Sequence, residues 1–136
     1  SKYKKDVLIH AGLRDINDNS VIPHNKNTNT AHNLTPLEAA ISGINTPDNG
    51  GTADIIILAC PVSAHLQLLK RIARALYNLN AKNLLGTSNR PPILIGSLYG
   101  AGGLDWMARI AFTSQRPQTF THWNRPLGLF GLKAFP

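Results

Sequence analysis

A glycine-rich segment, residues 96–103 (GSLYGAGG), has the composition best suited to binding a ligand. It follows an apolar run at 93–95 and precedes a helical pattern that begins at Leu104. Four glycines in eight residues let a ligand approach the backbone closely. Backbone N–H groups at a helix start favour anions or a ligand carbonyl. Because the spacing is neither GxGxxG nor a P-loop, the segment indicates either a ligand-binding turn or a flexible crossover.

A second candidate segment consists of Cys60, Pro61, Val62 and Ser63. It directly follows the apolar run that begins at Ile55 and closes the stretch ADIIILACPVSAH. In open α/β sheets, ligands bind at the carboxyl ends of the strands. The sequence therefore predicts that this turn lies at the ligand-binding edge of a sheet.

The remaining reactive side chains give weaker signals. Cys60 lies in an apolar setting with no base suggested, which favours a buried small residue over a nucleophile. His65 is expected in the first turn of a helix, where it is a cap, a surface residue or a group near the ligand. His24 and His32 lack cysteine or carboxylate neighbours at metal-ligand spacing. We predict no catalytic residue and no metal site in this chain.

The apolar run 55–60 is rich in β-branched residues and is ended by a proline, a pattern typical of a parallel strand buried on both faces. Ser63 is expected to cap the helix that follows. Apolar residues recur there at spacings of three and four: Leu66, Leu69, Ile72, Leu76 and Leu79. The opposite face carries Lys70, Arg71, Arg74 and Asn78.

The other elements are placed by local signals. Thr35 and Glu38 form a capping box for a short helix at 37–42 with a proline at its first position, and Gly43 can end it. Further strands are expected at 7–9, 93–95 and 127–135, and a helix at 104–111, whose Trp106 and Met107 pack against the sheet. The segments 17–33, 45–52, 83–92 and 116–125 are expected to be loops, the first of them mobile and the last with the alternative of a weak strand.

The bulk composition describes one globular domain. The chain has 136 residues, of which 43% are hydrophobic and 15% charged, and a net charge of +7. This charge suggests a polyanionic partner, a basic surface or a fragment that has lost acidic neighbours. No basic helix or aromatic platform favours nucleic acid binding. A single cysteine and the lack of a signal peptide or membrane span favour the cytoplasm.

Three ordered blocks resemble the octopine and opine dehydrogenases, which bind NAD or NADP. They are DIIILACPVSAH, ILIGSLYGAGGLDWMAR and LFGLKAFP, and the preceding LEAAISG is similar to a short helix of that family. The family shares its fold with 6-phosphogluconate dehydrogenase. The resemblance implies a Rossmann domain followed by a helical substrate domain. It also implies reductive condensation of an amino acid with a 2-oxo acid.

The resemblance assigns two groups of residues to the cleft. Cofactor contacts are implied for Cys60, Pro61, Val62, Ser63, Ser97, Leu98, Tyr99 and Gly100. The substrate side of the turn would be formed by Gly102 and Gly103.

The chain departs from the family by lacking the GxGxxG fingerprint. The catalytic histidine–carboxylate pair of the family would lie after residue 136. We therefore expect an α/β fold that is the second part of a Rossmann-type parallel sheet flanked by helices. On this reading, residues 1–136 are a partial NAD(P)-binding domain, inactive alone, whose partner is the missing remainder of the parent dehydrogenase. The alternative is a non-catalytic Rossmann remnant that serves as a structural or assembly subunit.

Overall fold

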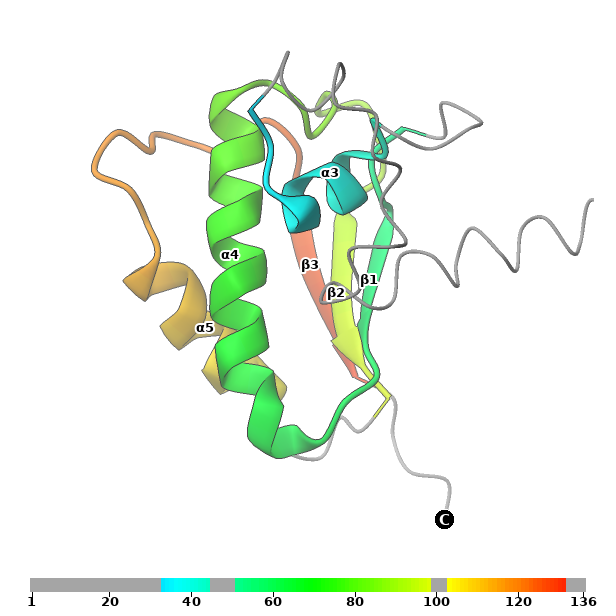
Figure 1. Cartoon of the computed structure of the whole chain (residues 1–136), viewed down its shortest axis with the longest axis vertical. Coiled ribbons are helices and arrows are strands. Elements are labelled where there is room, and N and C mark those ends of the chain that lie inside the picture. The colour runs from blue at the N-terminus through cyan, green and yellow to red at the C-terminus, as the bar shows by residue number, and fades with distance from the viewer. Residues whose placement is uncertain (1–32, 45–50, 99–102, 132–136) are drawn as a thin grey trace, which may run out of the picture. The chain divides into compact units, whose positions relative to one another are not determined.

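The computed structural model describes residues 33–44, 51–98 and 103–131 (Figure 1). The chain divides into two compact units, Ser1–Ala53 and Asp54–Pro136. The first contains helix α3 (Pro36–Ser42). The second contains, in order, β1 (Ile55–Leu58), a 3₁₀ turn (Val62–Ala64), α4 (His65–Ala81), β2 (Ile93–Ser97), α5 (Leu104–Ser114) and β3 (Leu127–Gly131).

Helix α3 is held by the predicted capping box. The Glu38 N–H donates to the Thr35 hydroxyl at 3.3 Å, and the Thr35 N–H donates to the Glu38 carboxylate at 3.4 Å. Gly43 ends the helix in the left-handed conformation, with φ 67°, and its N–H donates to the Ala39 carbonyl at 3.1 Å. The sequence prediction for this helix is confirmed at both ends.

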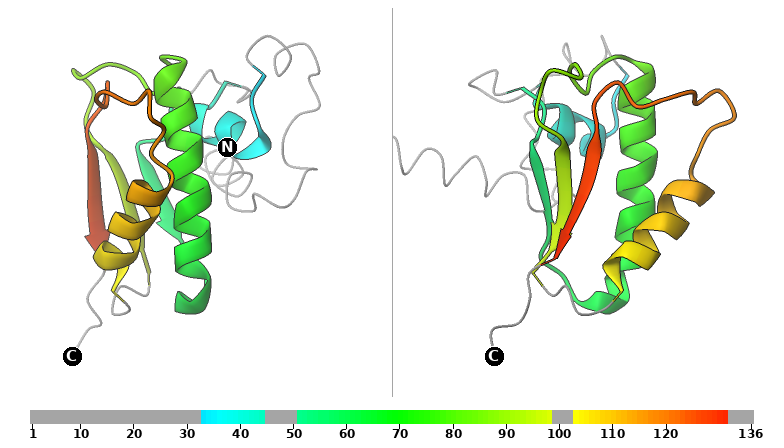
Figure 2. Two further views of the ribbon diagram at one scale, coloured as in Figure 1. Left: turned by 90° about the vertical axis from the view of Figure 1, so that its left-hand side faces the viewer. Right: turned by 180° about the vertical axis from the view of Figure 1, so that it is seen from behind.

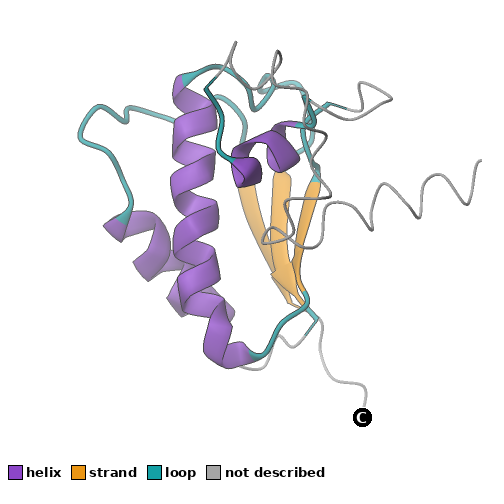
Figure 3. Ribbon diagram, viewed as in Figure 1, coloured by secondary structure: helices purple, strands orange, loops and turns teal. Residues whose placement is uncertain are grey.

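The second unit is an open sheet of three parallel strands in the order β1-β2-β3. Helix α4 connects β1 to β2, and α5 connects β2 to β3. Both helices lie together on one side of the strands (Figures 1 and 3). Consecutive right-handed crossovers in one direction along a sheet place their helices on the same face. The predicted α/β class, part of a Rossmann-like fold, is therefore confirmed.

The two turned views show α4 and α5 beside one face of the sheet (Figure 2). The core of this unit lies between that face and the two helices. Its fully or nearly fully buried apolar side chains include Leu58, Leu69, Ile72, Ala73, Ala75, Leu76, Tyr77, Leu79, Leu85, Ile93, Ile95, Leu104, Met107, Ala108 and Ala111. The apolar stripe predicted on α4 is thus confirmed, with Leu66 half-buried at the helix start. Arg71, Arg74 and Asn78 are exposed on the other face.

The opposite face of the sheet corrects one prediction. Ile55 is 56% exposed and Ile57 is 53% exposed, so β1 is not buried on both faces. Side chains alternate between the faces of a strand, and both crossover helices occupy one face. A continuous apolar run therefore places half of its side chains on the side that α4 and α5 leave uncovered.

Several boundaries and contacts also differ from expectation. Ser63 makes no capping hydrogen bond, because a 3₁₀ turn precedes α4. Met107 is buried as predicted, but Trp106 is 64% exposed and does not pack against the sheet. Both β2 and α5 run past their predicted ends, to Ser97 and Ser114, and 116–125 is a loop. Expectations for 7–9, 17–32, 45–50 and 132–135 fall outside the described residues.

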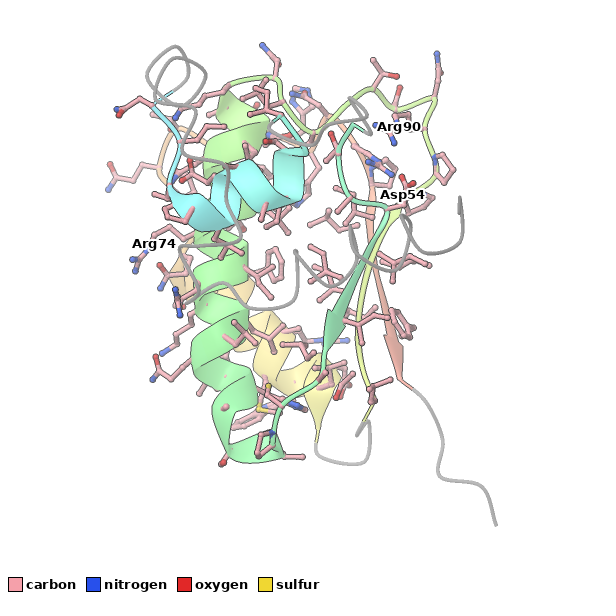
Figure 4. The ribbon with its side chains drawn as sticks, turned by 45° about the vertical axis from the view of Figure 1, so that its right-hand side comes forward. Asp54, Arg74 and Arg90 are labelled. Atoms are coloured by element: carbon pink, nitrogen blue, oxygen red, sulfur yellow. The ribbon has the colours of Figure 1, made fainter. Side chains whose placement is uncertain are left out.

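The amino ends of the strands are joined by a buried arginine. The Arg125 guanidinium is fully buried and donates to the Pro91 carbonyl at 2.7 Å and to the Leu85 carbonyl at 3.3 Å. It also donates to the Asp54 carboxylate at 2.5 Å, and Arg90 pairs with the same oxygen at 3.1 Å. Figure 4 shows Asp54 and Arg90 near one another at the start of β1. This cluster fixes the loop before β2 and the entry to β3.

Candidate functional site at the carboxyl edge of the sheet

The two turns selected from the sequence begin at neighbouring strand ends. Leu58 pairs with Ser97 in the parallel register, and the Leu98 N–H donates to the Leu58 carbonyl at 3.3 Å. The turn that contains Cys60 therefore lies beside the segment that leaves β2. The register of the sheet brings together two segments that are about 35 residues apart in the sequence.

The predicted site residues differ in exposure. Pro61, Val62, Ser63 and Leu98 are exposed, Cys60 is half-buried and Ser97 is fully buried. Tyr99, Gly100 and Gly102 lie outside the described residues. The exposed members leave the backbone of the first turn open to a ligand, whereas Ser97 faces the interior.

Gly103 precedes α5 and has a backbone that favours glycine. Its φ is 78°, in the left-handed region, and its carbonyl accepts the Met107 N–H at 3.1 Å. Within the part of the chain that the structure describes, a Cβ built at Gly103 would have no heavy atom within 4 Å, and the residue is exposed. The start of α5 is therefore open on this side. Free N–H groups of its first turn can meet an anion or a carbonyl there.

His65 holds the two turns together. The side chain is fully buried, and its Nε2 lies 3.1 Å from the Cys60 carbonyl oxygen and 3.3 Å from the Ser97 hydroxyl. The expectation of a capping or surface histidine is therefore wrong. The residue follows a 3₁₀ turn, which directs its ring into the interior instead of toward solvent.

The tautomer of His65 follows from its partners. Because a carbonyl oxygen only accepts hydrogen bonds, Nε2 carries the hydrogen in the neutral ring. The remaining lone pair is on Nδ1, which is buried and has no hydrogen-bond partner among the described residues. Ser97 therefore does not face the basic nitrogen, and the pair lacks the geometry of an activated nucleophile. The pair instead links the ends of β1 and β2 through hydrogen bonds.

The described turns at the carboxyl edge contain no lysine, arginine, aspartate or glutamate. None of these residue types occurs in 58–65 or 97–98, and Asp105, in the first turn of α5, is the acidic residue nearest to Leu98 in the sequence. The Asp54, Arg90 and Arg125 cluster lies at the other end of the strands. The described part of this edge can therefore bind a ligand through backbone N–H groups and apolar contact.

Comparisons with known proteins identify no relative. No family model, curated protein or solved structure matches this chain. Within the described residues, no group of three or more histidine, cysteine or acidic side chains could hold a metal ion. No helix of that same part of the chain is long and apolar enough to cross a membrane.

An aromatic pocket that the sequence did not indicate lies at the other end of α4. Tyr77 stacks on Trp123, with ring centroids 4.6 Å apart, and meets Phe120 edge-on at 4.9 Å. The Tyr77 hydroxyl donates to the Phe112 carbonyl at 2.7 Å. A pocket of about 150 Å³ borders this cluster and is lined by Tyr77, Asn80, Ala81, Pro117, Thr119, Phe120, Thr121, His122 and Asn124.

The pocket is remote from the carboxyl edge. Tyr77 lies 12 residues after His65, roughly 18 Å along the helix axis. The available sequence signal was the concentration of aromatic residues between 112 and 123, in a segment that otherwise reads as a loop. The pocket is therefore not part of the cleft that the two turns would form.

Proposed function

We propose that this chain is part of an NAD(P)-dependent oxidoreductase similar to the opine dehydrogenases. The reaction would be the reductive condensation of an amino acid with a 2-oxo acid. One observation supports the proposal: the turn after β1 lies beside the end of β2 at the carboxyl edge of a parallel sheet. Dinucleotides bind at this edge in doubly wound α/β proteins.

In this proposal the edge forms one wall of the cofactor cleft. Cys60, Pro61, Val62 and Ser63 line the NAD or NADP from β1. Leu98 continues the wall from β2, and the buried Ser97 supports it from the interior. By resemblance to the family, Tyr99 and Gly100 would also contact the cofactor, and Gly102 and Gly103 would belong to the substrate side. The buried His65 fixes the relative position of the two turns through its contacts with Cys60 and Ser97.

The remainder of the parent dehydrogenase is the principal partner in this scheme. Among the described strands, only β2 pairs with β1, and the outer edge of β1 has no neighbour. A phosphate-binding half-sheet could add a strand there, beside the turn at Cys60. The small-molecule partners are an amino acid and a 2-oxo acid, and we place the reaction in the cytoplasm.

Chemistry in the parent would depend on residues outside this chain. Residues 58–65 and 97–98 contain no lysine, arginine, aspartate or glutamate, and His65 and Ser97 are hydrogen-bonded to each other. The GxGxxG segment that holds the pyrophosphate is also absent from the sequence. The chain alone is therefore expected to be inactive and to bind reduced cofactor weakly.

Titration of the isotopically labelled chain with NADH and with NADPH, followed by NMR, tests the proposal. Weak binding is expected, with a Kd of roughly 1 mM or higher, and the shifted amides should be those of residues 60, 62, 63, 98 and 103. Ser63→Asp should weaken binding further, because it adds a negative charge beside an anionic ligand. Thr113→Asp adds the same charge at the exposed end of α5 and should leave the titration unchanged.

A different shift pattern would contradict the proposal. Shifts confined to the aromatic pocket around Tyr77 would place a ligand elsewhere. Tight, saturable binding by the chain alone would show that the missing phosphate loop is not required.

The second candidate is a non-catalytic Rossmann remnant that serves as a structural or assembly subunit. The observation that favours it is the missing phosphate loop in a chain whose edge side chains are bonded to one another. A complete lack of amide shifts with millimolar NADH and NADPH would support this reading over the first.

A further inference from the structure

We propose that the aromatic pocket at the end of α4 binds a pyrimidine nucleotide, with the base inside the pocket and the phosphate at Arg116. This site is separate from the cofactor cleft, because none of the residues that line the pocket belongs to the two turns at the carboxyl edge. The failure of either proposal therefore leaves the other standing.

The walls of the aromatic pocket are held in place by hydrogen bonds. The Asn80 side chain is 8% exposed, accepts the Asn124 N–H at 2.8 Å and donates to the His122 carbonyl at 3.0 Å. In the same loop, the Phe120 N–H donates to the Pro117 carbonyl at 3.1 Å. Because these contacts order the loop before a ligand arrives, little conformational freedom is lost on binding.

The volume of the aromatic pocket selects a single ring. The pocket holds about 150 Å³, and a protein cavity of about this volume accommodates one benzene molecule. A purine has two fused rings and needs more space. The pocket therefore fits the six-membered ring of a pyrimidine better than a purine.

The lining matches a flat ring that has a polar edge. Tyr77, Phe120 and Pro117 supply ring surfaces against which a planar ligand can stack or pack edge-on. The Thr119 hydroxyl and the Nε2 of His122 have no partner among the described residues. They can hydrogen-bond to the carbonyl and amide groups at the edge of a pyrimidine. A hydrocarbon ring would displace water from these groups without replacing its hydrogen bonds.

Arg116 supplies a positive charge beside the aromatic pocket. Its guanidinium carbon lies 5.2 Å from the centroid of the Phe120 ring, and Arg116 directly precedes Pro117. The side chain is exposed, and the sequence after Asp105 contains no acidic residue that would oppose an anion. A guanidinium binds phosphate through paired hydrogen bonds. This charge favours a nucleotide over a free base or a nucleoside.

Titration of the isotopically labelled full chain with uridine and cytidine monophosphates, followed by NMR, tests the proposal. Saturable binding is expected with a Kd of about 0.1–1 mM, and amide shifts should be confined to residues 77–81 and 118–124. Uridine should bind about tenfold more weakly, because it lacks the phosphate that Arg116 contacts. Adenosine monophosphate should also bind about tenfold more weakly, because its base exceeds the pocket.

Matched variants separate the charge from the pocket. Arg116→Gln should lower the affinity for uridine monophosphate about tenfold and leave the affinity for uridine unchanged, because it removes only the phosphate contact. Arg109→Gln removes the same charge from an exposed position two turns earlier in α5 and should change neither affinity. Ala81→Leu fills the pocket from the exposed end of α4 and should weaken both ligands alike. Thermal melts check that each variant is folded.

An oligonucleotide of four uridines identifies the source of the nucleotide. Affinity equal to that of uridine monophosphate would assign the pocket to free nucleotides. Affinity at least about tenfold higher would assign it to single-stranded nucleic acid, whose further phosphates add contacts. Either result supports the site, provided that the shifts remain at the aromatic pocket.

Three outcomes would overturn the proposal. The first is the lack of saturable shifts at the pocket with uridine or cytidine monophosphate up to about 10 mM. The second is an equal footprint from inorganic phosphate alone, or equal affinity for adenosine monophosphate, since the pocket would then not select a pyrimidine ring. The third is a footprint at residues 60, 62, 63 and 98, which would assign the nucleotide to the carboxyl edge.

Discussion

Arg125 is a cation inside the protein whose neighbours are fixed by hydrogen bonds. It joins the Asp54 carboxylate to the Pro91 and Leu85 carbonyls. Arg125→Met should lower the free energy of unfolding by about 3 kcal/mol, because it leaves buried carbonyls without a donor and one carboxylate without its buried partner. Urea denaturation monitored by circular dichroism measures this change.

Arg90 provides the matched control, since it pairs with the same carboxylate oxygen from a more exposed position. Arg90→Met should change the free energy of unfolding by no more than about 1 kcal/mol. Equal effects of the two substitutions would show that burial of Arg125 is not what stabilises this end of the sheet.

Tyr77 gives a pH-dependent prediction. Burial raises the pKa of the Tyr77 phenol above its ordinary value, although the nearby positive charge of Arg116 acts in the opposite direction. The folded state therefore keeps the proton at pH values where the unfolded chain has lost it. This contribution is complete below about pH 10, the unfolded pKa, and is lost as the pH rises through the folded pKa.

The Tyr77→Phe variant isolates that contribution. It removes the hydrogen bond to the Phe112 carbonyl and should cost about 1 kcal/mol at neutral pH. The stability difference between the two proteins should stay constant below about pH 10 and narrow above it. Parallel urea titrations at several pH values measure this, and a constant difference throughout would contradict the assigned role of burial.

The sequence identified residues of the carboxyl edge but not their environments. Helical periodicity could place His65 at a helix start, yet its burial depends on the 3₁₀ turn that rotates the ring inward. Arg125 could not be recognised as a core residue, because arginine is rarely buried and its three partners are distant in sequence. Such contacts depend on tertiary structure, which local patterns do not contain.

At the scale of elements, Gly96 couples β2 to β3. A Cβ at this position would come within 2.4 Å of the Phe130 ring. Gly96→Ala should therefore lower stability by about 1–3 kcal/mol through overpacking. The double variant Gly96→Ala with Phe130→Ala should lose less than the sum of the two single changes, because the methyl group then occupies space that the ring has left.

Urea denaturation measures the free energy of unfolding of the four proteins in this cycle. If the effects of Gly96→Ala and Phe130→Ala simply add, the Phe130 ring moves aside freely. Trp106→Ala is a suitable control partner for Gly96→Ala. Trp106 is exposed on α5, away from the contact between Gly96 and Phe130, and a coupling energy near zero is expected for it.

The loop between α5 and β3 is anchored by asparagines. Asn80 accepts the Asn124 N–H at 2.8 Å and donates to the His122 carbonyl at 3.0 Å. Asn80→Leu should cost about 1–3 kcal/mol, since two backbone groups lose their partner. Hydrogen exchange at Asn124 should rise, and unchanged protection there would contradict the anchoring role.

Elements with local signals were predicted best. The capping box of α3 and the apolar stripe of α4 depend on residues within one or two turns. Ser63 was predicted as a cap because serine is common at helix N-caps. In the structure Ser63 lies within the 3₁₀ turn Val62–Ala64 that precedes α4, so it is not at the cap position. Trp106 could not be oriented from sequence, since α5 has apolar residues on more than one side.

At the scale of the whole molecule, the order of strands and helices was enough to predict a parallel sheet. It was not enough to predict that one face would stay uncovered, because a run such as IIIL is equally compatible with one or two covered faces. The candidate site was predicted at the carboxyl edge of the sheet, because ligands of open α/β sheets bind at the carboxyl ends of the strands. The absence of the phosphate-binding motif can be read from the sequence. The hydrogen bond between His65 and Ser97 could not be predicted, because the two residues are 32 positions apart and meet only in the folded sheet.

The parallel register also has a kinetic consequence. Ile55 pairs with Leu94 and Ile93 with Leu127, so strand partners are separated by 39 and 34 residues. Contacts this distant form slowly, because a long loop must close before any pairing is gained. During that interval the unpaired IIIL strand is available to other chains. Refolding at increasing protein concentration should therefore give a rising light-scattering signal. Ile57→Lys should suppress this signal without slowing the refolding of chains that remain monomeric.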